Sequence, residues 1–301
     1  MFVLEKKTLL SSVVAFFLLR WLLYRVFRYR RGEKLVPGSI AVITGGGSGI
    51  GLEFAYLFAR AGCHVVLVGR NAENLHAARA SCLSLGAPTA EVVVADLSTV
   101  EGTDKVGDAL QGRQEPLKYL VLNAGAGAIV PFSSDPSFND VCDKMMQINY
   151  FSNVRLLQHL LPALEKSNSA ACSSRVIVLS SLAGVLPSVY RSAYTASKHA
   201  IQGFMNALRG ETAVPITLCC PGYVDTDFHQ QAQLTGAFAS NNTRRGVPAY
   251  VCARACLDGA LRGDAEVLTT LSGKLGYILR PIFTKFIDAR AKKISLHSLQ
   301  K

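Results

Sequence analysis

The sequence predicts the α/β class, with a single doubly wound parallel sheet forming the main domain. Two observations predict it. Short apolar runs at 40–43, 64–68, 91–95, 119–122 and 176–181 alternate with longer segments that read as helices, and this alternation is typical of parallel strands joined by crossover helices. Several of these runs also end in small or polar residues, and the carboxyl ends of such strands face one crevice where ligands bind.

The composition fits one or two domains with a large apolar core. The chain has 301 residues, of which 50% are hydrophobic, and a formal net charge of +11. A basic excess is typical of proteins that bind nucleic acid, an anionic membrane surface or an anionic cofactor. Here much of it adjoins an apolar segment near the amino end and lacks interleaved aromatics, so nucleic acid is not an expected partner. The 8 cysteines show neither a CxxC pair nor zinc-ligand spacing, which indicates free thiols, a reducing compartment and no metal site.

Residues 1–34 are predicted to form a membrane anchor and its basic flank. About twenty mostly apolar residues, as at 8–27, are enough to cross the hydrocarbon core of a bilayer. Arg20 interrupts this run, so the segment either spans the membrane or lies partly in the interface. If it spans, the basic cluster at 28–34 outweighs the two lysines before it and places the main domain on the cytosolic side.

A glycine-rich turn follows the first predicted strand. Residues 44–51 read TGGGSGIG, and a helix is expected from Leu52 to Ala61. Glycines let the backbone turn sharply and approach a pyrophosphate, whose charge meets the free N–H groups at the amino end of the helix. The candidate cofactor contacts in this turn are Gly45, Gly47, Ser48, Gly49, Ile50 and Gly51.

The ends of the next three strands supply further candidates. The second strand ends at Arg70; an acidic residue there would bind the ribose 2′-hydroxyl of NAD, whereas an arginine suits the 2′-phosphate of NADP. NADP(H) is therefore the expected cofactor, unless Arg70 merely begins the next helix at the surface. Asp96 ends the third strand, and Asn123, Ala124 and Gly125 follow the fourth, so these residues are expected to line the adenosine half of the cleft.

A tyrosine and a lysine are the strongest candidates for catalysis. Tyr194 and Lys198 lie about one turn apart on the same face of a predicted helix. A phenol with a pKa of about 10 carries protons poorly at neutral pH, and a neighbouring ammonium favours the phenolate. Tyr194 is therefore expected to be the general acid or base. Ser181 closes the strand at 176–181, where its hydroxyl can hold a substrate oxygen.

Taken together, these residues resemble the short-chain dehydrogenase/reductase family, which has a Rossmann-type fold. The resemblance covers 39–227 and rests on the glycine motif, Asp96, Asn123-Ala124-Gly125, Asn149, Ser181, Tyr194, Lys198 and Pro221-Gly222. It implies that Tyr194 transfers a proton, that Ser181 positions the reacting oxygen, and that Lys198 binds the nicotinamide ribose and lowers the pKa of Tyr194. Asn149, in a helix expected over 143–157, is implied to support a water relay. Thr226 is implied to contact the nicotinamide carboxamide.

The amino-terminal segment and the Ser-Ser-Leu-Ala-Gly run at 180–184 resemble the membrane-bound branch that includes 11β-hydroxysteroid dehydrogenase. That branch tends to carry acidic residues after the anchor, whereas this chain carries arginines. Its topology is therefore expected to differ, with an anchor in the endoplasmic reticulum and a catalytic domain that faces the cytosol.

A location beside lipid favours an apolar carbonyl or alcohol substrate, such as a steroid, retinoid, sphingoid or fatty compound. The loop at 229–246 is expected to cover the active site and to select the substrate. After the dinucleotide-binding domain at 35–270, an amphipathic extension at 271–301 either docks on the bilayer or packs on the core or a second subunit. A homo-oligomer is left open.

The predicted function is hydride transfer between NADP(H) and such a substrate. Two alternatives remain at this point. One is an NAD-linked dehydrogenase of lipid alcohols, and the other is a catalytically silent membrane scaffold that binds a dinucleotide.

Overall fold

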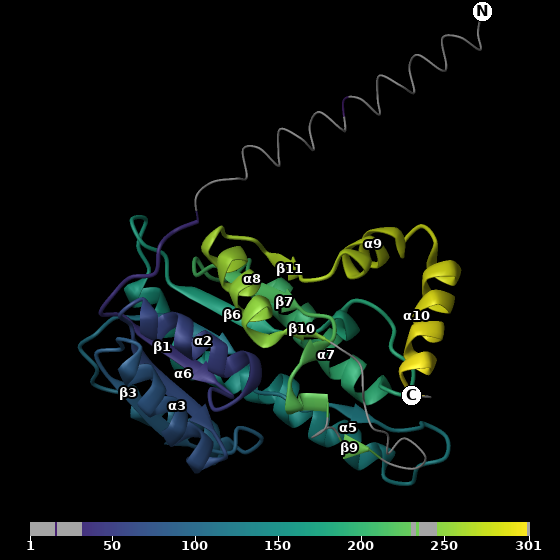
Figure 1. Ribbon diagram of the computed structural model, residues 1–301, viewed down its shortest axis with the longest axis horizontal. Helices are drawn as coiled ribbons and strands as arrows, with labels where there is room; N and C mark the ends of the chain where they lie inside the picture. The colour runs from purple at the N-terminus through teal and green to yellow at the C-terminus, as the bar shows by residue number, and fades with distance from the viewer. Residues whose placement is uncertain (1–15, 17–31, 230–232, 235–245, 300–301) are drawn as a thin grey trace, which may run out of the picture.

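Seven parallel strands form the central sheet of the computed structural model, which describes residues 16, 32–229, 233–234 and 246–299 (Figure 1). The strand order is β11-β7-β6-β4-β1-β2-β3, and every neighbouring pair is parallel. The strands are β1 (Ile40–Thr44), β2 (His64–Gly69), β3 (Ala90–Val94), β4 (Leu117–Leu122), β6 (Arg175–Leu179), β7 (Ile216–Cys220) and β11 (Glu266–Leu268). The predicted doubly wound α/β sheet is confirmed, and each predicted strand lies within two residues of its expected ends.

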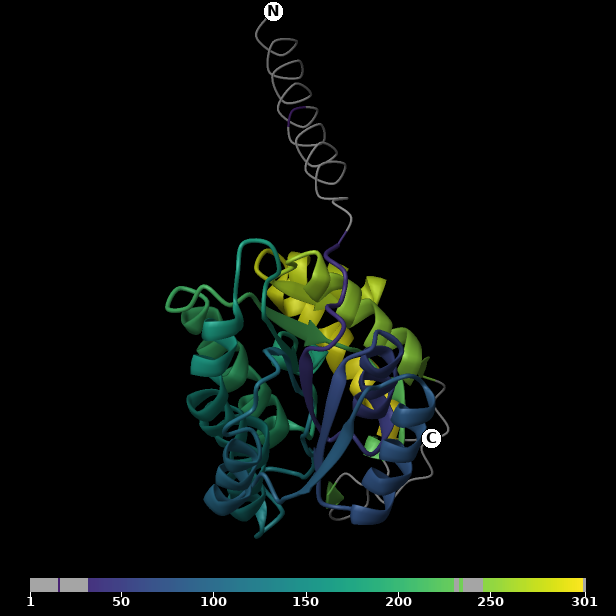
Figure 2. The same ribbon diagram turned by 90° about the vertical axis from the view of Figure 1, so that its left-hand side faces the viewer.

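Helices cover both faces of the sheet (Figures 1 and 2). One face is covered by α2 (Gly49–Arg60), α3 (Ala72–Ser84) and α8 (Ala249–Leu261), and the other by α4 (Val100–Ala109), α6 (Ser152–Ser167) and α7 (Ser192–Leu208). Side chains alternate between the faces along a strand. In β1, Ala41 and Ile43 therefore belong to one core cluster, and Ile40 and Val42 belong to the other. This double burial explains why the strands read as continuous apolar runs.

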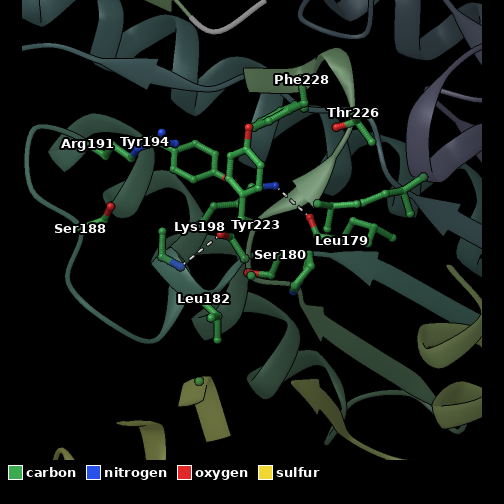
Figure 3. Close-up of a pocket in the computed structure, with 18 of the residues that line it drawn as sticks. Leu179, Ser180, Leu182, Ser188, Arg191, Tyr194, Lys198, Tyr223, Thr226 and Phe228 are labelled. Atoms are coloured by element: carbon green, nitrogen blue, oxygen red, sulfur yellow. Dashed lines mark hydrogen bonds between the residues drawn. The ribbon is translucent and has the colours of Figure 1, made fainter. Parts of the chain in front are cut away.

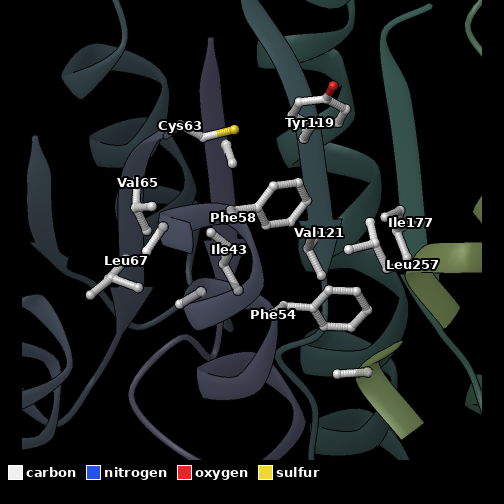
Figure 4. Packing of buried hydrophobic residues seen from close by; sticks show 14 of the residues in the cluster. Ile43, Phe54, Phe58, Cys63, Val65, Leu67, Tyr119, Val121, Ile177 and Leu257 are labelled. Atoms are coloured by element: carbon white, nitrogen blue, oxygen red, sulfur yellow. The ribbon is translucent and has the colours of Figure 1, made fainter. Parts of the chain in front are cut away.

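Aromatic residues fill the core between β1, β4 and α2 (Figure 4). The rings of Phe58 and Tyr119 have centroids 5.0 Å apart, and Phe54 stacks beside Phe58 at 6.5 Å. All three side chains are almost fully buried. They hold α2 against the sheet, and so they fix the position of the glycine turn at its amino end.

The strand order reverses between β1 and β4. The chain runs outward from β1 through β2 to β3, returns to β4 on the other side of β1, and continues through β6 and β7 to β11. Such a reversal leaves a crevice at the carboxyl ends of the two central strands, and α/β proteins bind their ligands there. Two short parallel pairs lie outside the main sheet: β5 (Ala128–Ile129) with β9 (Gln233–Leu234), and β8 (Val224–Asp225) with β10 (Val247–Pro248).

The segment that carries Asn149 differs from its prediction. The structure has α5 (Phe138–Met146), a π-helical turn at Gln147–Phe151 and then α6, rather than one regular helix over 143–157. A π turn inserts an extra residue and rotates the side chains that follow it, and such turns are frequent at functional sites. Asn149 lies in the middle of this turn and is completely buried.

Residues 32–36 are fixed along the edge of the domain where the strands begin. The Glu33 carboxylate lies 2.9 Å from Nη2 of the buried Arg175, the first residue of β6. The Glu33 N–H donates to the Leu261 carbonyl at 3.0 Å, and the Val36 N–H donates to the Tyr119 hydroxyl at 3.0 Å. The continuous part of the described chain therefore begins at Gly32, at the pole opposite the carboxyl ends of the strands.

Two helices end the chain, α9 (Leu271–Leu279) and α10 (Thr284–Leu299). The predicted anchor at 8–27 lies outside the described residues apart from Phe16. Among the helices that the structure does describe, none combines the length and apolar character needed to cross a bilayer. All 8 cysteines are free thiols, and most are buried.

Candidate active site

The turn between β1 and α2 forms a tight glycine cradle. Gly45 has a φ of +65°, in the left-handed region that favours glycine. A Cβ on Gly51 would lie 2.1 Å from the Gly45 carbonyl oxygen, so only glycine lets the first turn of α2 approach this closely. The Ser48 side chain makes no capping hydrogen bond, and the first N–H groups of α2 are therefore open to an anionic ligand. These features fit a dinucleotide pyrophosphate.

A hydrogen-bonded hub joins this cradle to the end of β4. The Thr44 hydroxyl accepts from the N–H groups of Asn123 (2.8 Å) and Ala124 (2.9 Å) and donates to the Val121 carbonyl at 3.1 Å. Asn123 in turn donates from Nδ2 to the Thr44 carbonyl at 2.9 Å. Thr44 was not among the predicted site residues, although its position at the last strand residue before the glycines could have indicated this role.

Arg70 and Asp96 follow the ends of β2 and β3, two strands that pair with each other. Arg70 is exposed, and its positive charge acts on the Asp96 carboxylate. Burial raises the pKa of Asp96, but two hydrogen bonds from Ser98 and the charge of Arg70 outweigh this effect, so the pKa of the carboxyl is lowered. An ionised carboxylate and a guanidinium at this end of the cleft fit the adenosine half of a dinucleotide.

The catalytic candidates converge on α7 and the end of β6. Tyr194 and Lys198 lie on the buried face of α7, with the Lys198 Nζ atom 5.9 Å from the centroid of the Tyr194 ring. Lys198 donates to the carbonyl of Leu179, the last residue of β6, at 2.8 Å (Figure 3). The Ser181 hydroxyl accepts from the Ala183 N–H at 3.1 Å, and a hydrogen bond links the side chains of Ser181 and Tyr194. The serine can therefore share a substrate oxygen with the tyrosine.

Burial dominates the protonation of this group. Tyr194 is 5% and Lys198 is 4% exposed. Burial raises the pKa of Tyr194, and the hydrogen bond from Ser181 and the charge of Arg191 only partly offset it. The same burial lowers the pKa of Lys198 to about 8. Burial thus sets the direction of the Tyr194 pKa in this structure, and the expected lowering of that pKa by Lys198 stays a prediction. Near neutral pH the Tyr194 phenol is therefore protonated, which is the form that reduction of a substrate carbonyl requires.

Asn149 acts from behind the site. Its amide donates to the Ala126 carbonyl and to the Ser197 hydroxyl, both at 3.0 Å, and its Oδ1 accepts from the Ala126 N–H at 3.0 Å. A Cβ on Gly125 would lie 2.7 Å from this Oδ1 and 3.5 Å from the Lys198 Nζ. The missing side chain at position 125 thus leaves Asn149 and Lys198 on either side of one small space. A water relay through Asn149 remains a prediction.

A cavity of about 470 Å³ brings most of the predicted residues together. Its lining includes Gly45, Ser48, Gly49, Ile50, Asn123, Ala124, Gly125, Ser181, Tyr194, Lys198 and Thr226. Gly47, Gly51, Arg70, Asp96 and Asn149 are not part of this lining. Gly51 and Asn149 support the cavity from behind, whereas Arg70 and Asp96 lie further out along the sheet.

Other parts of the lining had not been predicted. Leu186 and Pro187 come from the loop before α7, and Ala291 and Ile294 come from α10. These residues make the wall beyond Tyr194 largely apolar. No local pattern marks them in the sequence, because they reach the cavity only through the packing of the carboxyl-terminal helices.

The phosphate cradle and the proton-transferring side chains open into the same cavity. This combination defines the class of the protein, an oxidoreductase that uses a nicotinamide dinucleotide. Residues 39–236 match the family model described as short chain dehydrogenase. The chain belongs to the short-chain dehydrogenase/reductase family.

Known proteins show how far this similarity extends. The chain is 31% identical to the dehydrogenase/reductase SDR family protein 7-like of Dictyostelium discoideum, over 89% of this chain and 85% of that protein. It is 35% identical to the hydroxysteroid 11-beta-dehydrogenase 1-like protein of Gallus gallus, over 64% of this chain and 66% of that protein.

Solved structures share the fold. A short-chain dehydrogenase from Sphingobium yanoikuyae in complex with NADPH has a TM-score of 0.69 and 20% identity, over 83% of this chain and 95% of that one. A short-chain dehydrogenase/reductase from Burkholderia phymatum in complex with NAD has a TM-score of 0.70 and 23% identity, over 83% of this chain and 95% of that one. The fold is thus compatible with either nucleotide.

Proposed function

We propose that the protein is a membrane-associated, NADP(H)-dependent oxidoreductase that acts on a carbonyl or hydroxyl group of an apolar substrate. The observation that carries this proposal is the cluster of Tyr194, Ser181 and Lys198 at one end of an apolar cavity whose other end is a phosphate cradle. Steroids, retinoids, sphingoid bases and fatty aldehydes or alcohols are the substrate classes that such a wall favours. The similarity to hydroxysteroid 11-beta-dehydrogenase 1-like proteins supports the same substrate classes.

The side chains divide the chemistry between them. The bound nicotinamide supplies or accepts the hydride. Tyr194 donates its phenolic proton to the substrate oxygen in reduction and removes the proton in oxidation. Ser181 holds the same oxygen by a hydrogen bond, so that it faces the phenol. Lys198 supplies a positive charge beside the phenolate that forms during reduction, and this charge stabilises it.

The preference for NADP(H) rests on Arg70. Its guanidinium lies at the end of β2, where it can pair with a 2′-phosphate in bidentate geometry. We expect Arg70→Asp to weaken NADPH binding by about 10- to 100-fold, the loss of a charge-assisted hydrogen-bonding pair, and to improve NADH binding.

Fluorescence titration of each nucleotide measures this change. Arg60→Asp is the control, because Arg60 is exposed at the last residue of α2, the end of this helix away from the glycine cradle. An unchanged ratio of NADPH to NADH affinity in Arg70→Asp would support the alternative of an NAD-linked alcohol dehydrogenase.

The function as a whole is tested by titration followed by turnover. The detergent-solubilised protein should bind NADPH in preference to NADH and oxidise it in the presence of at least one ketone or aldehyde from a lipid panel. Binding without any turnover would favour the silent scaffold. Failure to bind either nucleotide would contradict the proposal that the protein is a nicotinamide-dependent oxidoreductase.

Membrane attachment through the amino terminus is tested by a truncation that the structure refines. Glu33 is bonded to Arg175 and Leu261, so the deletion should stop at residue 31 to keep these contacts. We expect the full chain to stay in the membrane pellet when membranes are washed at alkaline pH. The truncated chain should be released into the supernatant. Equal extraction of both proteins would argue against an anchor at 8–27.

A further inference from the structure

Arg191 brings a positive charge to the cavity beside the proton donor. It is the N-cap residue of α7 and stands three positions before Tyr194, so the two side chains are neighbours on that helix. Both line the same cavity. Burial raises the pKa of Tyr194, and the charge of Arg191 opposes this rise. A guanidinium therefore lies close to the place where a substrate oxygen would meet the phenol.

The position of Arg191 sets it apart from the cofactor contacts. Figure 3 shows Arg191 and Ser188 at one side of the cavity and Thr226, the expected contact of the nicotinamide, at the other. Arg70, the cation that is expected to bind the 2′-phosphate, lies outside the cavity lining. Arg191 thus faces the substrate rather than the nucleotide.

The backbone just before Arg191 is held in an unfavourable conformation. Tyr190 has a φ of +60°, and among the residues that the structure describes it is the only one other than glycine with a positive φ. The Val130 N–H donates to the Tyr190 carbonyl at 2.8 Å and stabilises this turn. Strained residues of this kind concentrate at ligand-binding sites, where the strain pre-organises the site. Here the turn sets the direction in which α7 begins, and with it the placement of Arg191.

The lining around Arg191 is mostly apolar with two hydroxyl groups. Leu186 and Pro187 belong to the loop before α7, and Ile294 belongs to α10. The hydroxyls are those of Ser188 and Ser295. The Ser295 hydroxyl accepts from the Val189 N–H at 3.4 Å, which holds α10 against this loop. An apolar wall beside one guanidinium and two hydroxyls fits a long hydrocarbon chain that carries one acidic group.

The charges of the lining favour a carboxylate over a phosphate monoester. In the part of the chain that the structure describes, the lining holds two cations, Arg191 and Lys198, and one anion, Asp227. Lys198 donates to the Leu179 carbonyl and is expected to bind the nicotinamide ribose. One guanidinium matches one carboxylate in bidentate geometry. A phosphate of nearly two negative charges would be repelled by Asp227 with a single cation left to offset it.

We propose that Arg191 binds a carboxylate of the substrate, and that the favoured substrates are oxo or hydroxy acids with a long apolar chain. The carboxylate pairs with the guanidinium while the reacting oxygen faces Tyr194 and Ser181. The reacting carbon then lies within a few bonds of the carboxylate, because Arg191 and Tyr194 are neighbours on one helix. The inference rests on the proposed function for its reaction, but binding of the carboxylate requires no turnover.

Calorimetric titration with decanoate tests the binding without chemistry. Decanamide has the same shape without the charge, and the full-length solubilised protein should bind it more weakly, both with and without NADP+. Arg191→Met should lower the affinity for decanoate by about 10- to 100-fold, the loss of a charge-assisted pair, and that for decanamide far less. Arg191→Lys keeps the charge and should lose less. Arg254→Met is the control, because Arg254 is exposed on α8, pairs with Asp258 and lies outside the lining.

Steady-state kinetics tests the same contact during the reaction. A long-chain oxo acid should have a KM about 10- to 100-fold lower than that of its methyl ester, since the ester lacks the charge. Arg191→Met should remove this preference by raising the KM for the acid, and Arg191→Lys should restore part of it. A parallel titration with NADPH shows whether the variants keep the folded site.

The outcomes separate this inference from the proposed function. Equal affinity of the native protein for decanoate and decanamide would overturn the inference, and so would tighter binding of decyl phosphate than of decanoate. If decanoate binding depends on Arg191 but no acid, ester or ketone turns over, the proposed function fails while the carboxylate site stands. Turnover of neutral ketones without any preference for the oxo acid would support the proposed function and contradict the inference.

Discussion

Tyr194→Phe is expected to reduce kcat by about 100- to 10,000-fold, the usual contribution of a general acid or base. The phenol lines the cavity and is hydrogen-bonded to Ser181, the side chain that we expect to hold the substrate oxygen. The ring itself is retained, so its packing in the cluster with Ala193 and Val130 should persist. NADPH affinity should therefore stay nearly constant, and steady-state kinetics with a parallel fluorescence titration separates the two quantities.

Tyr250→Phe is the control for this variant. Tyr250 is 61% exposed on α8 and lies outside the cavity lining, so the same chemical change there should leave kcat unaltered. Turnover of Tyr194→Phe at the native rate would contradict the assignment of the proton donor. Loss of NADPH binding together with turnover would instead indicate that the change disrupts the site.

Lys198→Met is expected to act in opposite directions on activity and on stability. Turnover should fall by about 100-fold or more, because the phenolate loses its neighbouring charge, and NADPH binding should weaken. The free energy of unfolding of the cofactor-free protein should rise at pH 7 by about 1 to 2 kcal/mol. The native lysine is charged there although it is 4% exposed, and methionine removes this cost at the loss of one hydrogen bond to Leu179.

The pH dependence of stability follows from the same group. Burial lowers the pKa of Lys198 from 10.5 to about 8. Below pH 8 the folded and unfolded chains are both protonated, and the folded state bears the full cost of about 3 kcal/mol. Between pH 8 and 10.5 the folded chain releases its proton first, so the unfolding free energy contributed by this lysine rises with pH. Above 10.5 the cost is gone, and with it the advantage of Lys198→Met.

Chemical denaturation at several pH values measures this difference. Lys105→Met is a close control, because Lys105 also donates to the last carbonyl of a strand, that of Val94, at 2.8 Å but is exposed. It should change the unfolding free energy by less than about 0.5 kcal/mol at any pH. A fall in stability of Lys198→Met at pH 7 would show that the buried ammonium is not a cost to the fold.

Features governed by local pattern could be predicted from the sequence. The strands are buried on both faces and therefore appear as apolar runs, and Tyr194 and Lys198 share a helix face because of their spacing alone. The π turn around Asn149 could not be foreseen, since it inserts one residue into an otherwise ordinary helical pattern. The raised pKa of Tyr194 depends on the depth of burial, which spacing does not report.

Contacts between segments that lie far apart in the sequence could not be predicted from it either. Ile294 reaches the cavity because glycines in α9 allow that helix to approach the loop before α7. The sequence showed that 271–301 is amphipathic but left open which side would pack and which would stay exposed. That choice depends on the shape of the loop surface, including Leu182 and Leu186.

The ion pair between Glu33 and Arg175 gives mechanical load a second path into the sheet, beside the backbone that runs on to β1. Through the ion pair, a pull on Gly32 acts at the first residue of β6, whereas Leu179, which accepts from Lys198, is the last residue of that strand. The separation is about 13 Å along the strand, and the pull is resisted in shear by neighbouring parallel strands on both sides. A pull at Gly32 would thus act on the end of β6 that lies away from the catalytic side chains.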